Sequence, residues 1–452
     1  MGLTREIGEF LAAPPLPPAA AWNTVRIGFT DCLGVMTAGW EEAAPALLRR
    51  ELLGSSQMFW PELLDRASAP DAGLLLGAAA HVLDFDDTGL DGHPSAILLP
   101  AILAEGHAMG AGGSDMATAF LAGYEVWAEL VSREPASHHS KGWHPSAVFG
   151  PLAAAAASAV LRRLDAAQAT RAMSLAASMA GGVVANFGSM SKCYQTGRAV
   201  QSGLLATRLS EAGLTAAVDA LEHPLGLLRA LSPREGVDLE GPAAMGTRWR
   251  ILERGINVKL YPVCYAAHRM LDAMDRIRRT HSLMADDVVE VVVEVGPSQA
   301  AMLREHRPTN ATQAKFSAEF ALASMALTGR CGLAELSDAI VTRSDVQAFM
   351  PKVRVEVVQG VSMVEPTMSR ADRVTVSFRD GRVVDSGWIE LPRGHFLKQA
   401  TAADLHEKFV ACVTPRFGAV EAERQFSATR EGERLPDLDT LAPRADQLRR
   451  AV

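Results

Sequence analysis

The first half of the chain has apolar residues at intervals of three and four positions, from about residue 20 to about residue 250. Glycine, proline and helix-capping residues interrupt this spacing repeatedly, which predicts a series of helices joined by short turns. Ser114 is a predicted helix N-cap, and Asp165 with Gln168 is a predicted capping box. Residues 153–157 are all alanine, which lets neighbouring helices approach closely. The pattern therefore predicts a compact helical bundle.

Near residue 285 the hydrophobic period changes from that of a helix to that of a strand. Two of the four strand-like segments flank an Asp380-Gly381 pair, which is typical of a hairpin turn. Helices are predicted at about residues 265–280 and 314–327. We therefore expect an α+β domain with an antiparallel sheet. The predicted strands are residues 288–295, 353–358, 373–378 and 383–391.

Helical spacing returns after residue 400, so the C-terminal part of the chain is expected to rejoin the first domain. The predicted fold class is mainly α, with a large all-helical bundle domain and a smaller α+β domain. The predicted limits are residues 1–254 for the first part of the helical domain, 255–395 for the α+β domain and 396–452 for the return. A length of 452 residues agrees with more than one domain and allows a deep cleft.

The composition is that of a globular protein with a large core, since 48% of the residues are hydrophobic and 21% are charged. The net charge is −8, and the sequence has no basic block that would neutralise nucleic-acid phosphates. Nucleic acid is therefore not an expected partner. If the substrate is an anion, its counter-charge must come from individual lysines placed at the site.

The five cysteines are odd in number, widely spaced and form no Cys-x-x-Cys pair. This pattern predicts neither a disulfide framework nor a zinc or iron–sulfur site, and it favours a reducing, cytoplasmic location. The longest apolar run, residues 147–161, contains Gly150 and Pro151 and is shorter than the roughly 20 residues of a membrane span. It is expected to be a buried helix, and no membrane association is predicted.

Residues 81–94, HVLDFDDTGLDGHP, carry most of the unusual chemistry of the first half of the chain. Asp84, Asp86, Asp87 and Asp91 occur without a Lys or Arg between them. Clustered carboxylates repel one another unless a cation or a proton is supplied from elsewhere. This stretch is therefore predicted to form one wall of an active site that later segments complete.

Three further segments place titratable residues beside Gly or Pro within apolar surroundings: residues 142–145, 188–192 and 258–264. They contribute His144, Lys192 and Lys259. Each residue also has a structural interpretation, because Asp84 can cap a helix, His144 can be a core or turn histidine, and Lys192 can be a solvated surface lysine.

Two histidines, His93 and His144, precede prolines in predicted turns, where loops present side chains at the ends of rigid helices. Together with a carboxylate and two lysines they form an acid–base set for an anionic substrate. Removal of a proton next to a carboxylate needs a base of moderate pKa and fixed cations that stabilise an enediolate. The sequence has no Gly-x-Ser-x-Gly elbow, Walker loop or strand-linked Gly-x-Gly-x-x-Gly that would favour acyl, phosphoryl or hydride transfer.

Five motifs in this sequence resemble the MmgE/PrpD family, which comprises 2-methylcitrate dehydratases, cis-aconitate decarboxylases and iminodisuccinate epimerases. The similarity runs in the same order from about residue 20 to about residue 400. The motifs are HVLDFDDT with HPS, GWHPSAVFG, GSMSK before a Gly-Arg-Ala helix, LEHPLGLLRAL and KLYPVCYAAH.

The resemblance implies a large all-helical domain built from both ends of the chain and a smaller α+β lid domain. It also implies a homodimer and chemistry without a metal or an organic cofactor. By their positions in the motifs, the active-site residues implied are Asp84, Thr88, His93, His144, Lys192 and Lys259.

The sequence departs from the family pattern at three points. Gln195 occupies the position of a histidine that follows the active-site lysine in many relatives. Phe320 stands where the decarboxylases have a tyrosine, and the spacer between Thr88 and His93 is one residue shorter than in the decarboxylases. Loss of the phenol removes a possible proton donor, so the departures favour dehydration over decarboxylation.

The function expected from the sequence is dehydration of a hydroxy acid of the 2-methylcitrate type by a cofactor-independent lyase. His144 or His93 exchanges the proton, Asp84 orients or polarises a histidine, and Lys192 and Lys259 hold substrate carboxylates. Asp86, Asp87 and Asp91 are assigned to hydrogen bonds within the turn. Decarboxylation and epimerisation are the alternatives on the same fold. An alternative of another class is a catalytically inactive carboxylate-binding or scaffold protein.

Overall fold

The structure is a computed structural model, and it describes residues 2–54, 58–281, 283–364, 368–431 and 435–441. The chain divides into two compact units. Unit 1 comprises Met1–Asn257 together with Ala402–Val452, and unit 2 comprises Val258–Thr401. The predicted class, mainly α with one small sheet, is confirmed by the element order.

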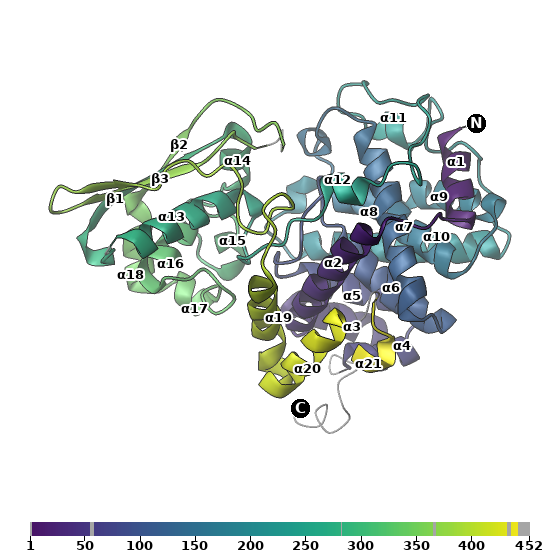
Figure 1. Ribbon diagram of the computed structural model, residues 1–452, viewed down its shortest axis with the longest axis horizontal. Coiled ribbons are helices and arrows are strands. Elements are labelled where there is room, and N and C mark those ends of the chain that lie inside the picture. The colour runs from purple at the N-terminus through teal and green to yellow at the C-terminus, as the bar shows by residue number, and fades with distance from the viewer. Residues whose placement is uncertain (1, 55–57, 282, 365–367, 432–434, 442–452) are drawn as a thin grey trace. The chain divides into compact units, whose positions relative to one another are not determined.

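Unit 1 is built from helices (Figure 1). Most of them bury one face or their whole length, as the three-and-four spacing predicts. The helices are α1 (Leu3–Ala12), α2 (Ala19–Gly39), α3 (Ala43–Leu53), α4 (Trp60–Arg66), α5 (Ala69–His81), α6 (Ser95–Met109), α7 (Gly113–Ser132), α8 (Pro145–Leu161), α9 (Ala166–Met179), α10 (Ser191–Glu211), α11 (Leu227–Leu231), α12 (Arg250–Arg254), α19 (Ala402–Phe417), α20 (Ala419–Arg430) and α21 (Leu438–Leu441).

Helix α10 packs against α5 and α8 through two glycines. A Cβ at Gly197 would meet the carbonyl oxygen of Leu74 on α5, and a Cβ at Gly203 would meet that of Pro151 on α8. Any side chain larger than hydrogen would therefore push α10 away from α5 at position 197 and away from α8 at position 203. The close approach fixes the height and the rotation of α10, which carries Lys192 near its start.

One of the two predicted helix caps is confirmed. Asp165 and Gln168 form a capping box, in which the backbone N–H of Gln168 donates to Asp165 Oδ1 at 2.8 Å. The prediction of Ser114 as an N-cap is wrong, because α7 begins at Gly113. The N–H of Gly113 donates instead to Asp437 Oδ1 at 2.7 Å, so the acceptor comes from the far end of the chain.

The C-terminal part of the chain returns to unit 1, and α19 lies beside α2 (Figure 1). Its Lys408 is buried, with Nζ 2.5 Å from Asp31 Oδ1 on α2 and donating to the carbonyl oxygen of Phe85 at 2.7 Å. The ammonium group also lies 4.1 Å from the centroid of the Phe85 ring. The returning helix therefore supplies a cation beneath the acidic stretch of residues 84–91.

Unit 2 contains a four-stranded sheet in the order β2-β1-β3-β4, with α13 and α16 packed against it. Its buried face includes Val291, Val293 and Val374. The strands are β1 (Val288–Val295), β2 (Val353–Val357), β3 (Arg373–Phe378) and β4 (Val383–Asp385). The helices are α13 (His268–Thr280), α14 (Pro297–Met302), α15 (Ala311–Ala314), α16 (Ala318–Thr328), α17 (Asp338–Val341) and α18 (Ser344–Phe349).

The sheet is mixed, so the prediction of an antiparallel sheet is wrong for one pair of strands. Strands β3 and β4 form the predicted antiparallel hairpin, and β1 is antiparallel to β3. Strand β2 is parallel to β1. Five helices, α14 to α18, connect β1 to β2, and a connection of this length returns the chain to the starting end of the sheet, as parallel pairing requires.

The five cysteines are all free and buried, which agrees with the absence of a disulfide framework. Among the described residues, no helix combines the length and the apolar character that crossing a membrane requires.

We predict that Lys408→Met destabilises unit 1 by about 3–5 kcal/mol, because it leaves the buried carboxylate of Asp31 without this counter-charge. Urea unfolding followed by circular dichroism measures the change. Arg66→Met, which removes an exposed ion pair with Glu62 on α4, is the matched control and should change stability by less than about 1 kcal/mol.

Adding Asp31→Asn to Lys408→Met removes the buried charge itself, so the double variant should regain part of the lost stability. Equal effects of Lys408→Met and Arg66→Met would show that the buried pair does not stabilise the fold.

Candidate active site

The acidic stretch forms an irregular loop between the end of α5 at His81 and the start of α6 at Ser95. Its backbone has positive φ at Asp84 (52°), Leu90 (51°) and Asp91 (59°), which non-glycine residues rarely adopt. Regular structure would separate the side chains of this loop onto different faces. The left-handed residues instead turn several of them toward one place, so the loop is where the candidate site is built.

Asp84 forms an ion pair with Lys192, near the start of α10. The Lys192 side chain is only 10% exposed, and its ammonium group lies 5.2 Å from the centroid of the Phe187 ring. The interpretation of Lys192 as a solvated surface lysine is therefore wrong. The two residues are 108 positions apart in the sequence, and the pair gives the acidic loop one of its counter-charges.

Asp86 is the hydrogen-bond acceptor for two imidazoles. Its Oδ2 lies 2.9 Å from Nδ1 of His81 and 2.9 Å from Nδ1 of His93. Nδ1 of His93 is also 3.0 Å from the carbonyl oxygen of Asp87. Burial acts to raise the pKa of Asp86, but the two imidazoles outweigh it and hold this pKa well below its usual range. A charged carboxylate accepts hydrogen bonds only, so both Nδ1 atoms carry the proton.

His81 is fully buried, and burial lowers its pKa to about 4 despite the neighbouring Asp86. The ring is therefore neutral at physiological pH, with the lone pair on Nε2. Among the described residues, that Nε2 atom has no hydrogen-bond partner. His81 is not among the site residues predicted from the sequence, and it ends the apolar helix α5, as a core histidine could.

His144 lies at the N-cap of α8, and its Nδ1 is 2.8 Å from Oε1 of Gln195. Its ring is 4.8 Å from that of Phe187 and 6.0 Å from that of His81, centroid to centroid. Burial lowers the pKa of His144 well below its usual range, and the neighbouring His81 and Lys192 lower it further. Nε2 of His144 is also buried and has no hydrogen-bond partner among the described residues.

The geometry thus gathers four of the six residues predicted from the sequence, Asp84, His93, His144 and Lys192, around His81. The ring centroids of His81 and His93 are 4.3 Å apart. All of these side chains belong to unit 1, and they come from α5, the acidic loop, the start of α8 and the start of α10.

The other two predicted residues have different surroundings. Thr88 is held by its backbone, which exchanges two hydrogen bonds of 2.9 and 2.8 Å with Asn257, and its hydroxyl donates to the carbonyl oxygen of Gly92 at 3.1 Å. Lys259 belongs to unit 2 and is buried. Phe320, where the decarboxylases have tyrosine, lies in the hydrophobic core of unit 2.

The roles predicted for the aspartates need one correction. Asp86 was assigned to hydrogen bonds within the turn, but its carboxylate accepts hydrogen bonds from Nδ1 of His81 and Nδ1 of His93, and so it orients both rings. Asp87 serves the loop as predicted, accepting from the N–H and the hydroxyl of Ser95 at 3.3 and 2.9 Å. Burial, with Asp31 and Asp86 nearby, raises the pKa of Asp87 well above its usual range.

Three residues of the site have the donor types of a metal centre. One ligand atom each of His81, Asp84 and His93 lies within 4.8 Å of the other two. The carboxylate of Asp84, however, already pairs with the Lys192 ammonium, so a divalent cation would have to displace a charge that is part of the structure. The arrangement fits a lysine-neutralised site better than a metal site.

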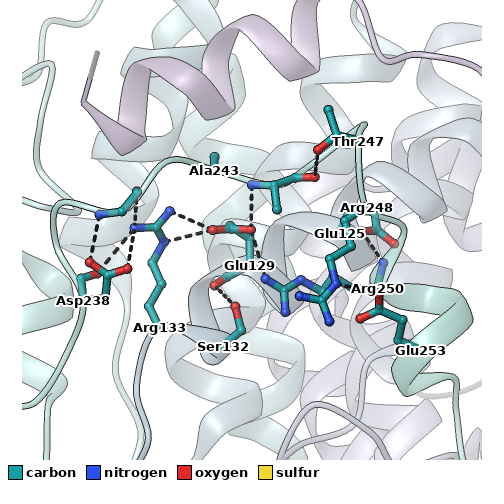
Figure 2. Close-up of polar contacts among 12 residues, drawn as sticks. Glu125, Glu129, Ser132, Arg133, Asp238, Ala243, Thr247, Arg248, Arg250 and Glu253 are labelled. Atoms are coloured by element: carbon teal, nitrogen blue, oxygen red, sulfur yellow. Dashed lines mark hydrogen bonds and ion pairs between the residues drawn. The ribbon is translucent and has the colours of Figure 1, made fainter.

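A polar network on α7 holds the segment that leads to Asn257. Figure 2 shows the carboxylates of Glu125 and Glu129 directed toward this segment. Glu125 accepts from the N–H groups of Arg250 and Ile251, both at 2.9 Å, and Glu129 accepts from the N–H of Ala244 at 3.2 Å. These bonds anchor α12, and the strand-like pairing of Asn257 with the acidic loop follows three residues after it.

Two family models match the chain. The MmgE/PrpD N-terminal domain matches residues 5–240, and the MmgE/PrpD C-terminal domain matches residues 261–432. Relatives include cis-aconitate decarboxylase of Homo sapiens, which is 24% identical over 402 residues, covering 85% of this chain and 81% of the relative. Cis-aconitate decarboxylase of Mus musculus is 26% identical over 382 residues, covering 82% and 77%. That of Aspergillus terreus (strain NIH 2624 / FGSC A1156) is 26% identical over 401 residues, covering 83% and 79%.

We predict that His81 makes the protein less stable as the pH falls. Its pKa is about 4 in the folded chain against 6.5 for an unperturbed histidine, so the unfolded chain binds more protons between these values. The stability is complete above pH 6.5 and declines as the pH falls toward 4. His81→Asn keeps an N–H donor for Asp86 but does not titrate. Between pH 7.5 and pH 5 the parent should lose about 2 kcal/mol more than this variant in urea unfolding.

The other histidines are present in both proteins, so the difference between the two pH dependences reports His81 together with the groups coupled to it, His144 and Asp86. A pH dependence that is the same in the parent and in His81→Asn would show that His81 is not held neutral by the fold.

Proposed function

The chain belongs to the MmgE/PrpD family, as its motifs predicted, and from this premise we propose that it is a lyase acting on a small di- or tricarboxylate. It removes a proton next to a carboxylate and uses neither a metal nor an organic cofactor. The observation that carries the proposal is a neutral, buried imidazole, His144, whose Nε2 has no hydrogen-bond partner among the described residues and which lies near the Lys192 ammonium.

In the proposed reaction, Nε2 of His144 accepts the proton from the carbon next to the carboxylate. The electron pair left on that carbon forms a carbon–carbon double bond, and a hydroxyl group leaves from the neighbouring carbon. In this proposal His93 enters as an imidazolium, with Nδ1–H donating to Asp86, and it donates from Nε2 the proton that converts this hydroxyl to water. Lys192 stabilises the negative charge that develops on the substrate carboxylate. Lys259 is the proposed second cation for the substrate, and Thr88 a proposed substrate-binding residue.

Dehydration of a hydroxy acid of the 2-methylcitrate type is the preferred reaction. Nε2 of His144 is buried without a hydrogen-bond partner among the described residues, and burial disfavours the charged ring, so its lone pair is available to accept a proton. Decarboxylation instead produces a carbanion that must receive a proton, so it needs an acid at the same carbon. Phe320 also lacks the phenol that a tyrosine would offer at this position.

Decarboxylation of cis-aconitate is the second candidate. It is favoured by the relatives, since the human, mouse and Aspergillus terreus proteins are named cis-aconitate decarboxylases. Both reactions require a stabilised carbanion next to a carboxylate, so the same lysine and imidazole serve either one. Epimerisation of iminodisuccinate is a third reaction of this kind, and the homodimer implied by the resemblance stays part of the proposal.

The test is incubation of the purified protein with 2-methylcitrate, citrate, cis-aconitate and iminodisuccinate in deuterated water. NMR follows the products and the exchange of carbon-bound protons for deuterium. We expect turnover or exchange with at least one of these acids, and a loss of about 10²- to 10⁴-fold in His144→Ala and in Lys192→Ala. Arg66→Met, in the exposed ion pair on α4, is the control and should keep the parent rate.

The four acids also separate the candidate reactions. Release of carbon dioxide from cis-aconitate without dehydration of 2-methylcitrate would replace the preferred reaction by the second candidate. Binding of an acid without any exchange or turnover would instead identify a catalytically inactive carboxylate-binding protein.

A further inference from the structure

Gln195 lies three residues after Lys192 on α10, so the two side chains leave the same side of the helix. Lys192 reaches Asp84, and Gln195 reaches His144. One helical turn therefore contacts both the carboxylate side and the imidazole side of the site. Gln195 is also the position at which the sequence departs from the histidine of many relatives.

The orientation of the Gln195 amide is fixed by the backbone around it. Its Nε2 donates to the carbonyl oxygen of Val183 at 3.1 Å. That carbonyl is held in place because residues 182–184 pair with residues 142–144, through His144 N–H to Gly182 O at 3.0 Å and Val184 N–H to Gly142 O at 2.9 Å. A carbonyl oxygen can only accept a hydrogen bond, so the NH₂ group must face Val183 and the Oε1 atom must face His144.

The fixed amide determines which nitrogen of His144 carries the proton. Oε1 of Gln195 is an acceptor, so Nδ1 of His144, 2.8 Å away, must be the donor in the neutral ring. The lone pair is then on Nε2, the atom that is buried without a partner among the described residues. We propose that Gln195 is a positioning residue that holds His144 in the Nδ1–H tautomer and so presents Nε2 as the base. The role of Nε2 as the base rests on the proposed function, whereas the tautomer of His144 does not.

An amide and a carboxylate have different effects on an imidazole partner. Asp86, the partner of His81 and His93, is charged and stabilises an imidazolium. Gln195 is neutral and gives His144 a hydrogen bond without a negative charge. The groups that act on His144 most strongly through charge, His81, Lys192 and His93, also disfavour its protonated form. A proton taken by His144 is therefore readily passed on.

The side-chain amide of Gln195 fits beside His144 because residue 182 is a glycine. A Cβ at this position would lie 2.9 Å from Oε1 of Gln195 and would also meet the Cβ of Ala147. The hydrogen bond between Gln195 and His144 thus depends on a glycine in the segment that pairs with the His144 turn.

The experiment uses the full-length protein labelled with ¹⁵N at histidine, without any substrate. The ¹⁵N shifts and proton couplings of an imidazole distinguish the protonated from the unprotonated nitrogen, and loss of a signal in His144→Asn assigns the residue. In the parent we expect a protonated Nδ1 and an unprotonated Nε2.

In Gln195→Leu the His144 ring should become a mixture of the two tautomers. In Gln195→His, which keeps one donor and one acceptor, the tautomer of the parent should largely return.

Gln195→Glu tests the effect of charge. A carboxylate beside Nδ1 should raise the pH at which His144 protonates by about one unit or more. The acid limb of kcat/KM for whichever acid is turned over should move upward by the same amount. Gln201→Leu, which removes an amide from the same helix that donates to Asp71 at 2.9 Å, is the control and should change neither the His144 signals nor the pH profile.

The inference is overturned if the parent has its proton on Nε2 of His144, or if Gln195→Glu protonates at the parent pH. These readouts do not need turnover, so they stand even when none of the four acids reacts. Conversely, loss of activity in His144→Ala together with a normal pH profile in Gln195→Glu would leave the proposed function in place and remove Gln195 from it.

Discussion

The carboxylates of Asp31, Asp84, Asp86 and Asp87 are all buried within one region of unit 1, and the structure depends on how their charges are balanced. Each carboxylate is balanced by a different group. Lys192 from α10 pairs with Asp84, Lys408 from α19 pairs with Asp31, and two imidazole N–H groups bind Asp86. Burial, with Asp31 and Asp86 nearby, raises the pKa of Asp87, and its carboxyl group accepts a hydrogen bond from Ser95. Because buried charges without partners cost several kcal/mol each, the acidic loop can adopt its conformation only when distant helices are in place.

This balance also bears on why His81 and His144 are neutral. Lysines supply counter-charges to Asp84 and Asp31, and the two imidazole rings are buried. Burial therefore lowers the pKa of His81 and His144 even though carboxylates lie close by. A neutral imidazole beside a fixed ammonium group is the combination that proton removal next to a carboxylate requires. The chemistry proposed for the site follows from the way the loop is neutralised.

Local features of the sequence predicted local features of the fold. The capping box at Asp165, the first three strand segments and the Asp380-Gly381 hairpin depend on neighbouring residues, and they are found where the sequence placed them. The fourth strand, predicted over residues 383–391, is shorter and ends at Asp385. The predicted N-cap of α7 was wrong, because the N–H at the start of this helix donates to Asp437 from the far end of the chain. The predicted direction of β2 was wrong, because it depends on the long connection between β1 and β2.

In the candidate site, too, features that depend on neighbouring residues could be predicted and features that depend on distant residues could not. Four of its residues were identified from Gly and Pro neighbours and from family motifs, but the partners of each were not. Asp84 pairs with a lysine and Asp86 with two imidazoles, and these partners depend on an irregular loop backbone that residue types do not predict. Lys408, in an ordinary amphipathic helix, gave no signal of a role more than 300 positions away. His81 was hidden by the apolar helix it ends, yet it lies at the centre of the imidazole cluster.

The return of α19 to unit 1 has a consequence for the order in which the protein is made. A ribosome synthesises Asp31 and the acidic loop first, then the whole of unit 2, and only afterwards Lys408. Until Lys408 has been joined, the Asp31 carboxylate lacks this counter-charge, so the buried ion pair between α2 and α19 can form only after the whole of unit 2 has been synthesised.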